Sequence, residues 1–368
     1  MPFRYAHGAG DDWRAIAQNC VTQLGSGGPE NLGFLYVTDL LAEHIEQITA
    51  FFRDRTGVAH WIGGTGIGVC ATGREYLDEP AMAVMLAEFA PGSFEVFANI
   101  RTTDDLNLRK LHVGGRQANF AIVHADPRNG SVPDLIAALA GKVDSGFVVG
   151  GLTSSRAENR QIADKLLEGG ISGVLLSDEI TVATRLTQGC SPIGEKHRIT
   201  EAQRNIILKL DGKPALDVLK QDVGEKLARD LQRLGSTVFA GLPVAGSDTG
   251  DYLVRNLVGV DASRGLVAIG DNVESGGELV FCRRDNATAV EDMRRMLSSI
   301  KEGLYTKPRG AVYFSCLGRG ANLFGPDSEE LKLVQEALGD LPLVGFFCNG
   351  EISHNRLYGY TGVLTLFA

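Results

Sequence analysis

The sequence lacks the long apolar runs that membrane proteins and exported precursors carry. No stretch of eighteen consecutive apolar residues occurs, which is about the length that a helix needs to cross a bilayer. The first residues, 1–13, are polar and rich in glycine, without the apolar core of a signal peptide. The chain is therefore predicted to be a soluble protein of the cytoplasm, and no insertion into a membrane is expected.

Motifs for metals, nucleotides and common catalytic centres are also missing. The six cysteines form no C-x-x-C pair, which argues against a zinc ribbon or a thioredoxin-like centre and predicts free thiols in a reducing compartment. The seven histidines are scattered, so nothing supports a metal site built from several of them. A phosphate-binding loop, an H-E-x-x-H motif and a G-x-S-x-G elbow are all absent. Because these motifs are absent, the sequence does not identify a catalysed reaction.

Positive charge is in short supply. Lysine and arginine total 36 against 45 aspartates and glutamates, a formal net charge of −9, and no long basic stripe is present. Because nucleic acids are bound mainly through basic side chains, a nucleic-acid partner is not expected.

Proline is scarce as well, with 12 residues, and the 46 glycines follow no three-residue period, which excludes a collagen-like chain.

The residues that are present fit a folded protein of more than one domain. Apolar residues make up 44% and charged residues 22% of the 368 positions, which is enough apolar material for a buried core. The pattern of elements changes along the chain, and a boundary near residue 220 divides it into two comparable parts. We therefore predict two domains, over residues 28–220 and 221–368.

A recurring order of elements indicates repeated α/β units. An apolar strand, an amphipathic helix, a second strand and a glycine-containing turn follow one another three times. The expected elements are residues 33–37, 43–53 and 58–62, then 119–124, 133–140 and 146–149, and finally 310–314, 328–338 and 341–347. Ser328 is the expected N-cap of the last helix. The predicted fold class is α/β (α+β), with repeated strand-helix-strand-strand units in two comparable sheet-containing parts packed around a cleft. Chance recurrence of common patterns is the alternative.

Polar and glycine-rich segments follow the strands of these units. They are Thr38-Asp39, His124 to Asp126 and Ser315-Cys316 after the first strands, and residues 63–66, 150–154 and 348–351 after the partner strands. Ligands of α/β proteins commonly bind at the carboxyl ends of the strands. If the units pack around one axis, these segments face a common cleft.

The segment Ser315–Gly320 (S-C-L-G-R-G) combines a thiol, a cation and two glycines. Gly318 and Gly320 allow a tight turn and a close approach of the backbone to a ligand. Arg319 can bind a carboxylate with two hydrogen bonds, and a nearby cation lowers the pKa of a thiol. Three interpretations stay open: Cys316 and Arg319 line a pocket, Cys316 is a catalytic nucleophile, or a buried cysteine ends the strand while the arginine caps the loop.

Two other side chains are candidates for ionic or acid–base roles. Glu351 follows Asn349-Gly350, a pair that is typical of hairpin turns. It can pair with Arg319, bind an ammonium group or be a solvated turn residue. His124 lies two residues before Asp126. These two residues form either an acid–base pair or the end of a strand that turns before Pro127.

Several of these motifs resemble the FIST domain. The most specific are S-C-L-G-R-G and Leu343–Ile352 (L-V-G-F-F-C-N-G-E-I). Trp61–Gly66, Gly146–Gly151 and Leu210–Leu216 add to the resemblance. It covers almost the whole chain, as an N-terminal and a C-terminal FIST part. The turn at Gly63–Gly66 departs from the commoner family form, because Ile67 follows where an acid is usual.

The resemblance implies a small-ligand sensory module of signal transduction, known from bacteria, for which amino acids are the proposed ligands. The residues that match the family's C-terminal pattern are Cys316, Gly318, Arg319, Gly320, Gly345, Gly350 and Glu351. Together with the segments named above, the expected ligand-binding residues are Cys316, Gly318, Arg319, Gly320, Asn349, Gly350, Glu351, Gly63, Gly64, Thr65, Gly150, Gly151 and His124.

Three functions stay open at this point. The first is a sensor that binds an amino acid or a similar small carboxylate, with Arg319 on the carboxylate and Glu351 on the amine. No output module is expected, so the signal would pass to a separate protein such as a histidine kinase or a cyclase. The second is a haem-binding nitric-oxide sensor with His112, His124 or His354 as the axial ligand. The third is a cysteine-dependent enzyme that uses Cys316 with His124. No cofactor is predicted for the first function.

Overall fold

The computed structural model describes residues 3–107, 111–228, 237–244 and 252–368. Contacts divide the chain into two compact units, which we call unit 1 (Met1–Thr187 and Val290–Ala368) and unit 2 (Gln188–Ala289). These bounds differ from the division predicted near residue 220, because unit 1 combines segments from both predicted domains. Unit 1 contains every residue that the sequence nominated for a ligand site.

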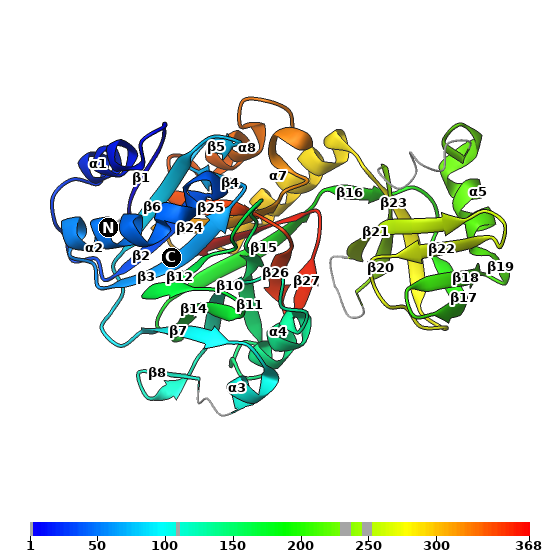
Figure 1. Ribbon diagram of the computed structural model, residues 1–368, viewed down its shortest axis with the longest axis horizontal. Coiled ribbons are helices and arrows are strands. Elements are labelled where there is room, and N and C mark those ends of the chain that lie inside the picture. Colours follow the sequence, from blue (N-terminus) through cyan, green and yellow to red (C-terminus); the bar gives the residue numbers. More distant parts are fainter. Residues whose placement is uncertain (1–2, 108–110, 229–236, 245–251) are drawn as a thin grey trace. The chain divides into compact units, whose positions relative to one another are not determined.

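Unit 1 is built from three six-stranded sheets (Figure 1). The first sheet has the order β1 (Arg4–Ala9), β6 (Ala81–Ala87), β2 (Leu32–Thr38), β3 (His60–Gly66), β12 (Gln161–Ala163), β13 (Lys165–Leu167). The second has the order β27 (Arg356–Tyr358), β26 (Glu351–His354), β11 (Phe147–Leu152), β10 (Phe120–Ala125), β14 (Ile171–Leu176), β7 (Phe94–Ile100). The third has the order β15 (Val182–Gln188), β28 (Thr361–Phe367), β24 (Gly310–Cys316), β25 (Leu343–Cys348), β4 (Gly68–Ala71), β5 (Arg74–Leu77).

Each sheet has one pair of parallel strands at its centre. β2 runs parallel to β3, β10 to β11 and β24 to β25. The helices α2 (Ile45–Thr56), α4 (Val132–Ala140) and α8 (Glu329–Leu338) connect these pairs. An antiparallel strand, β6, β14 or β28, flanks the first strand of each pair. The predicted α/β fold class and its repeated strand-helix-strand-strand unit are thereby confirmed.

The hairpin that follows each parallel pair leaves its own sheet. β4 and β5 follow β3 but join the third sheet beside β25. β12 and β13 follow β11 but join the first sheet beside β3, while β26 and β27 follow β25 but join the second sheet beside β11. The exchange is cyclic, and it ties each sheet to the next. Asn349-Gly350 is therefore not a hairpin turn, as its sequence suggests, but a crossing from the third sheet to the second.

One glycine in each parallel pair is required by the close approach of the neighbouring strand. A Cβ atom on Gly63, Gly150 or Gly345 would lie 1.8, 1.9 or 1.7 Å from a main-chain oxygen of the partner strand. These three glycines occupy the same register in the three sheets. We use this register below to define equivalent positions. Gly63 and Gly150 were predicted to lie in turns, but both lie inside strands.

The three sheets enclose one core whose centre is aromatic. Tyr36, His124 and Phe314 are equivalent residues of β2, β10 and β24, and their ring centroids lie 5.5 to 6.3 Å from one another. Phe346 stacks on Tyr36 at 5.2 Å. All four side chains are buried. The residues in this core alternate with residues that face outward, as expected for strands that are covered on both sides.

Helices cover the outer faces of the first and second sheets. α1 (Trp13–Leu24) and α2 pack their apolar residues against the first sheet, and α4 packs against the second. Asp12 caps α1, with its carboxylate accepting from the N–H of Arg14 at 3.1 Å. Among the described helices, none is long and apolar enough to cross a membrane.

Three short helical segments, a small hairpin and one further helix complete unit 1 and its border. They are η1 (Asp39–His44), α3 (Thr103–Asn107), η2 (Gly320–Asn322), the hairpin of β8 (His112–Val113) and β9 (Arg116–Gln117), and α7 (Asn286–Glu302). Ser328 does not cap α8 as predicted, because it has a left-handed backbone and its hydroxyl accepts from the N–H of Glu75 at 2.9 Å.

Unit 2 has an antiparallel sheet of its own. The sheet has the order β16 (Cys190–Pro192), β23 (Glu278–Arg284), β17 (His197–Gln203), β18 (Ile206–Leu210), β22 (Leu266–Ile269), β21 (Tyr252–Asp261), β20 (Val238–Pro243), with β19 (Lys213–Pro214) beside β18. The helix α5 (Ala215–Ala228) supplies Leu216 and Leu219 to its core. Residues 229–236 lie outside the described residues.

Candidate functional site

The glycine-containing turns that follow β3, β11 and β25 meet in unit 1, and they bond directly to one another. Ser154 donates its N–H to the carbonyl of Thr65 at 3.3 Å and its hydroxyl to the carbonyl of Phe347 at 2.5 Å. The N–H of Ile67 donates to the Ser154 hydroxyl at 2.8 Å. Leu152 donates to the carbonyl of Gly350 at 2.9 Å. Much of the polar capacity of these turns is therefore used to hold the three sheets together.

The polar residues at the strand ends have a structural role in two sheets. Thr38 and Asp126 are equivalent, and each bonds to main chain at, or two residues before, the start of the antiparallel strand beside it. The Thr38 hydroxyl accepts from the N–H of Ala81 at 2.9 Å, and the Asp126 carboxylate accepts from the N–H of Gly169 at 2.8 Å. Cys316 occupies the same position in the third sheet, where a thiol replaces the hydroxyl or carboxylate.

A second set of equivalent positions includes Glu351. Glu351 begins β26 and pairs with Gly151 of β11, just as Gln161 begins β12 and pairs with Gly64 of β3. One Glu351 oxygen, Oε2, accepts from the N–H and the hydroxyl of Thr361 at 3.1 and 2.9 Å. Its other oxygen, Oε1, is buried and has no hydrogen-bond partner in the described chain. The interpretation of Glu351 as a solvated turn residue is therefore wrong.

Arg319 is fully buried in the loop between β24 and η2. Its Nε donates to Glu330 Oε1 at 2.8 Å, and the ion pair is inaccessible to solvent. The two terminal nitrogens, Nη1 and Nη2, have no hydrogen-bond partner among the described residues. Burial by itself lowers the pKa of Arg319, but Glu330 and Tyr313 more than offset this and raise it, so the guanidinium stays charged.

Glu330 holds this loop by accepting four hydrogen bonds. Its Oε1 accepts from the Tyr313 hydroxyl at 2.6 Å and the Ser315 hydroxyl at 3.0 Å, in addition to Arg319. Its Oε2 accepts from the N–H of Gly320 at 2.7 Å. A buried carboxylate with this many donors fixes the geometry of the loop around the guanidinium.

Glu75 brings a second acid to the same place from the β4–β5 hairpin. It is buried, and burial together with nearby Glu330 raises its pKa to about 7. Its Oε2 atom has no hydrogen-bond partner in the described chain, and a Cβ on Gly320 would lie 2.9 Å from this oxygen. Gly320 therefore leaves room for the carboxyl of Glu75.

Cys316 is partly exposed at this place, whereas Cys348 beside it on β25 is buried. Burial is the main cause that raises the pKa of the Cys316 thiol, and the Glu351 carboxyl adds to it. Arg319 acts in the opposite direction but does not compensate. A thiol of raised pKa carries little thiolate at neutral pH, and this does not favour the nucleophile interpretation.

Glu351 and Arg319 influence each other electrostatically. Burial raises the pKa of Glu351 to about 8, while Thr361, Arg319 and the nearby Cys316 thiol act to lower it. The pairing of Glu351 with Arg319 that the sequence suggested is thus an interaction through space, since the ion-pair partner of Arg319 is Glu330. We call Cys316, Arg319 and Glu351, with the supporting Glu75 and Glu330, the Arg319 site.

His124 has no place in this site. Its ring lies in the aromatic centre of the core, where Nε2 bonds to the Tyr36 hydroxyl at 3.0 Å. Burial lowers its pKa to about 3, so it is neutral at physiological pH. Asp126 is instead bonded to Arg128 and opens a turn, so the acid–base interpretation of His124 and Asp126 is wrong. His112 is exposed on β8, and His354 lies against Phe147.

The other nominated residues surround the turns. Thr65 accepts from the N–H of Arg160 at 3.1 Å and is buried. Gly64 and Gly151 lie in strands, where a Cβ would reach Arg160 or Cys348. Gly318 is partly exposed, Asn349 is exposed and Gly350 is buried. Exposed and partly exposed residues therefore adjoin the buried charges of the Arg319 site.

Sequence reasoning missed Glu330, Glu75 and Thr361. Glu330 lies in the first turn of α8, where an acid is expected to complement the helix dipole, so nothing marked it as a buried partner. Glu75 follows a turn in a short hairpin, and only the exchange of hairpins between sheets brings it to Arg319. Thr361 offered no signal beyond its place at the start of a strand.

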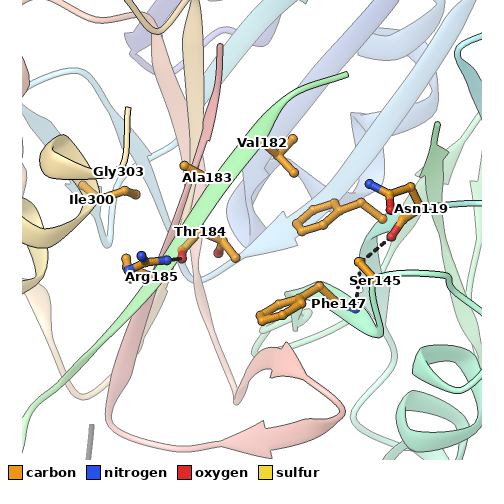
Figure 2. A pocket seen from close by; sticks show the side chains of 10 residues that line it. Asn119, Ser145, Phe147, Val182, Ala183, Thr184, Arg185, Ile300 and Gly303 are labelled. Atoms are coloured by element: carbon orange, nitrogen blue, oxygen red, sulfur yellow. Dashed lines mark hydrogen bonds between the residues drawn. The ribbon is translucent and has the colours of Figure 1, made fainter. Parts of the chain in front are cut away.

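A separate cavity of about 330 Å³ lies elsewhere in unit 1 (Figure 2). Its lining residues come from β10, β11, β15 and α7, and from the segments that adjoin them. They are Asn119, Phe120, Ser145, Phe147, Val182, Ala183, Thr184, Arg185, Ile300 and Gly303. None of them was nominated from the sequence.

Comparison with known proteins agrees with the motifs. The family model of the FIST N domain matches residues 31–213, and that of the FIST C domain matches residues 215–354. The chain is 31% identical over 357 residues to the uncharacterized protein Rv0628c of Mycobacterium tuberculosis, which covers 93% of this chain and 92% of that protein. It is 30% identical over 319 residues to the uncharacterized protein Mb0898c of Mycobacterium bovis, with 83% and 82% covered.

These matches define a small-ligand sensory module of signalling proteins. The chain belongs to the FIST family. The N-domain match contains Glu75 and the C-domain match contains Arg319, Glu330 and Glu351. Both family segments therefore contribute to the Arg319 site, which lies within unit 1.

Proposed function

We propose that the protein is a sensor that binds an amino acid or a similar small zwitterion at the Arg319 site and signals to a separate protein. The observation that carries the proposal is the set of unpartnered polar atoms at this site. Nη1 and Nη2 of Arg319 are two donors in the fork geometry that suits a carboxylate. Oε1 of Glu351 is an acceptor suited to an ammonium group. Buried polar atoms are rarely left without partners, so the grouping of several such atoms at one place supports a ligand there.

The electrostatics support this choice of ligand. Glu330 fixes the Arg319 loop without occupying the two terminal nitrogens. The pKa of Glu351, about 8, leaves this carboxyl largely protonated at pH 7. An ammonium group beside it favours the ionised form, so binding of the amine is expected to release a proton. Binding of a small ligand without an amine is not expected to release a proton from Glu351.

A thermal-shift screen of the twenty amino acids tests the proposal. We expect at least one to raise the melting temperature, and its deaminated and decarboxylated analogues to raise it less. Glu351→Gln keeps an oxygen that can accept from Thr361, so it should fold and lose the response to the amine. Arg319→Lys keeps the charge but loses the fork, and should weaken the carboxylate response. A screen without any stabilising amino acid would contradict the proposal.

A shift that both variants retain would place the ligand elsewhere in the protein. Leu40→Ala is a matched control for the variants, because Leu40 is 47% exposed and is not part of the Arg319 site. Leu40→Ala should bind the amino acid with the same affinity as the wild type.

A further inference from the structure

The cavity of Figure 2 is bordered by the edge of a strand. Four consecutive residues of β15, Val182 to Arg185, line it. Successive side chains of a strand point to opposite faces, so four neighbours in one lining mean that the main chain itself borders the cavity. β15 is the outermost strand of the third sheet, and on its other side it pairs with β28. Within the described residues no strand pairs with its free edge.

An exposed aromatic side chain lines the same cavity, and a second follows the lining residue Gly303 in the sequence. Phe147, which lines the cavity, is 38% exposed, and Tyr305, two residues beyond the lining residue Gly303, is 99% exposed. They are two of four large apolar side chains exposed in the described chain, the others being Leu40 and Val258. Aromatic side chains at a surface are typical of protein interfaces, where they supply much of the binding energy.

One cation borders the free edge. Arg185 is exposed, its Nη1 donates to the carbonyl of Thr184 at 2.8 Å, and its Nε donates to the Ser299 hydroxyl at 3.3 Å. Figure 2 shows Arg185, Ile300 and Gly303 on one side of the cavity and Phe147 with Ser145 on the other. A guanidinium has five N–H groups, so Arg185 keeps donors for an acid.

We propose that β15 docks an extended segment of a partner protein as an added strand. In this arrangement the main chain of the segment bonds to the free edge, an aromatic side chain enters the cavity beside Phe147, and an acidic side chain binds Arg185. Strand addition takes its affinity from main-chain hydrogen bonds and its specificity from pockets for alternate side chains. This surface shares no residue with the Arg319 site.

The test uses the full-length protein and a labelled peptide, acetyl-Thr-Phe-Val-Glu-Val-Thr-amide, whose Phe and Glu fall on one face of a strand. Fluorescence anisotropy measures its binding. Two versions are N-methylated on alternate residues, so one of them removes the main-chain donors that face β15. We expect the parent to bind and one methylated version to lose binding. If both methylated versions bind as the parent does, or if the parent does not bind, the proposal is wrong.

Exchanging the charges of Arg185 and the peptide glutamate tests whether these two side chains pair in the complex. Arg185→Glu should weaken binding about tenfold, as expected for a lost charged contact at an interface. A peptide with Lys in place of Glu should then bind this variant better than the wild type. Phe147→Ala should also weaken binding. Arg55→Glu and Leu40→Ala are the matched controls, because their side chains are exposed elsewhere in unit 1.

Two outcomes separate this proposal from other interpretations. If N-acetylphenylalanine amide competes with an affinity equal to that of the peptide, the cavity is a small-molecule site and the strand proposal fails. The Glu351→Gln variant should bind the peptide like the wild type. Failure of amino-acid binding and failure of peptide binding are therefore independent results.

Discussion

Gln161 and Glu351 hold equivalent positions beside β3 and β11, but their hydrogen bonds differ. Gln161 donates to the carbonyl of Gly170 at 2.9 Å and accepts from the Ser172 hydroxyl at 2.6 Å, so both ends of its amide are bonded. Glu351 bonds through one oxygen to Thr361, and its other oxygen has no hydrogen-bond partner among the residues that the structure describes. At this position the fold therefore needs a polar side chain that bonds the hairpin to the next strand. The carboxylate of Glu351 does this with one oxygen, so its second oxygen is not required for the fold.

The same contrast extends to the loops that follow the first strands. Asp126 is bonded to Arg128, which is about half exposed. Arg319 is buried, and its two terminal nitrogens have no hydrogen-bond partner within the described part of the chain. The strand ends of the first and second sheets thus bond to neighbouring main chain or side chains, whereas the third sheet ends near buried polar atoms that bond to no described residue.

The largest effect is expected from removing the guanidinium. Arg319→Leu leaves Glu330 as a buried, unpaired charge and should lower the free energy of unfolding by about 3–5 kcal/mol, measured by urea denaturation. Arg295→Leu breaks an exposed ion pair with Asp292 and should cost less than about 1 kcal/mol. Equal losses in the two variants would show that the Arg319–Glu330 pair is no more important than a surface pair.

Removing the hydrogen bonds of Gln161 should lower the free energy of unfolding by less than Arg319→Leu does. Gln161→Leu leaves the Ser172 hydroxyl and the Gly170 carbonyl without their partner and should destabilise the fold by about 1–3 kcal/mol. Glu351→Gln should cost less than Gln161→Leu at pH 7, because it makes the site resemble Gln161 and removes a carboxyl that burial disfavours. A larger loss for Glu351→Gln would contradict the assignment of these roles.

His124 offers a comparison within the core, because its equivalent in the third sheet is Phe314. His124→Phe leaves the Tyr36 hydroxyl unpartnered and should cost about 1–3 kcal/mol, which the double variant with Tyr36→Phe should partly recover. The pKa of His124 is about 3 when folded and ordinarily 6.5, so the wild type should lose stability as pH falls from 6.5 towards 3. The double variant should lose less over this range in thermal melts.

The smallest effect is the pH dependence due to Glu351. Its pKa rises from 4.5 to about 8 on folding, so between these values the folded state binds the extra proton. Stability contributed by this group is therefore present at low pH and falls as pH rises from 4.5 to 8. Glu351→Gln should flatten this part of the stability profile, and Glu75, with a pKa of about 7, should account for part of the remainder. An unchanged profile would contradict the raised pKa.

The sequence predicted the repeating units well, because strand and helix periodicities are local properties. It did not predict the exchange of hairpins, since Asn349-Gly350 has the composition of a hairpin turn and nothing local shows that β26 joins another sheet. It also placed Gly63 and Gly150 in turns, because a glycine that admits a crossing main chain looks the same in sequence as one that ends a strand. These errors arise where long-range packing decides the outcome.

The candidate site was predicted in part. Cys316, Arg319 and Glu351 were nominated together, and the structure places them within electrostatic reach of one another. Glu330 and Glu75, which surround Arg319, were not predicted. Glu330 has the sequence position of an acid that complements a helix dipole, and Glu75 comes from a hairpin that is distant in the sequence. His124 was nominated from its place at a strand end, yet its side chain faces the core between the sheets.

The most direct test of the Arg319 site is calorimetric titration with the amino acid that gives the largest thermal shift, in buffers of different ionisation enthalpy at pH 7. Because the pKa of Glu351 is about 8, we predict that the wild type releases close to one proton for each ligand bound. Glu351→Gln should bind at least about tenfold more weakly, as expected for a lost charged contact. Binding by the wild type without proton release, or unchanged affinity in Glu351→Gln, would contradict the account.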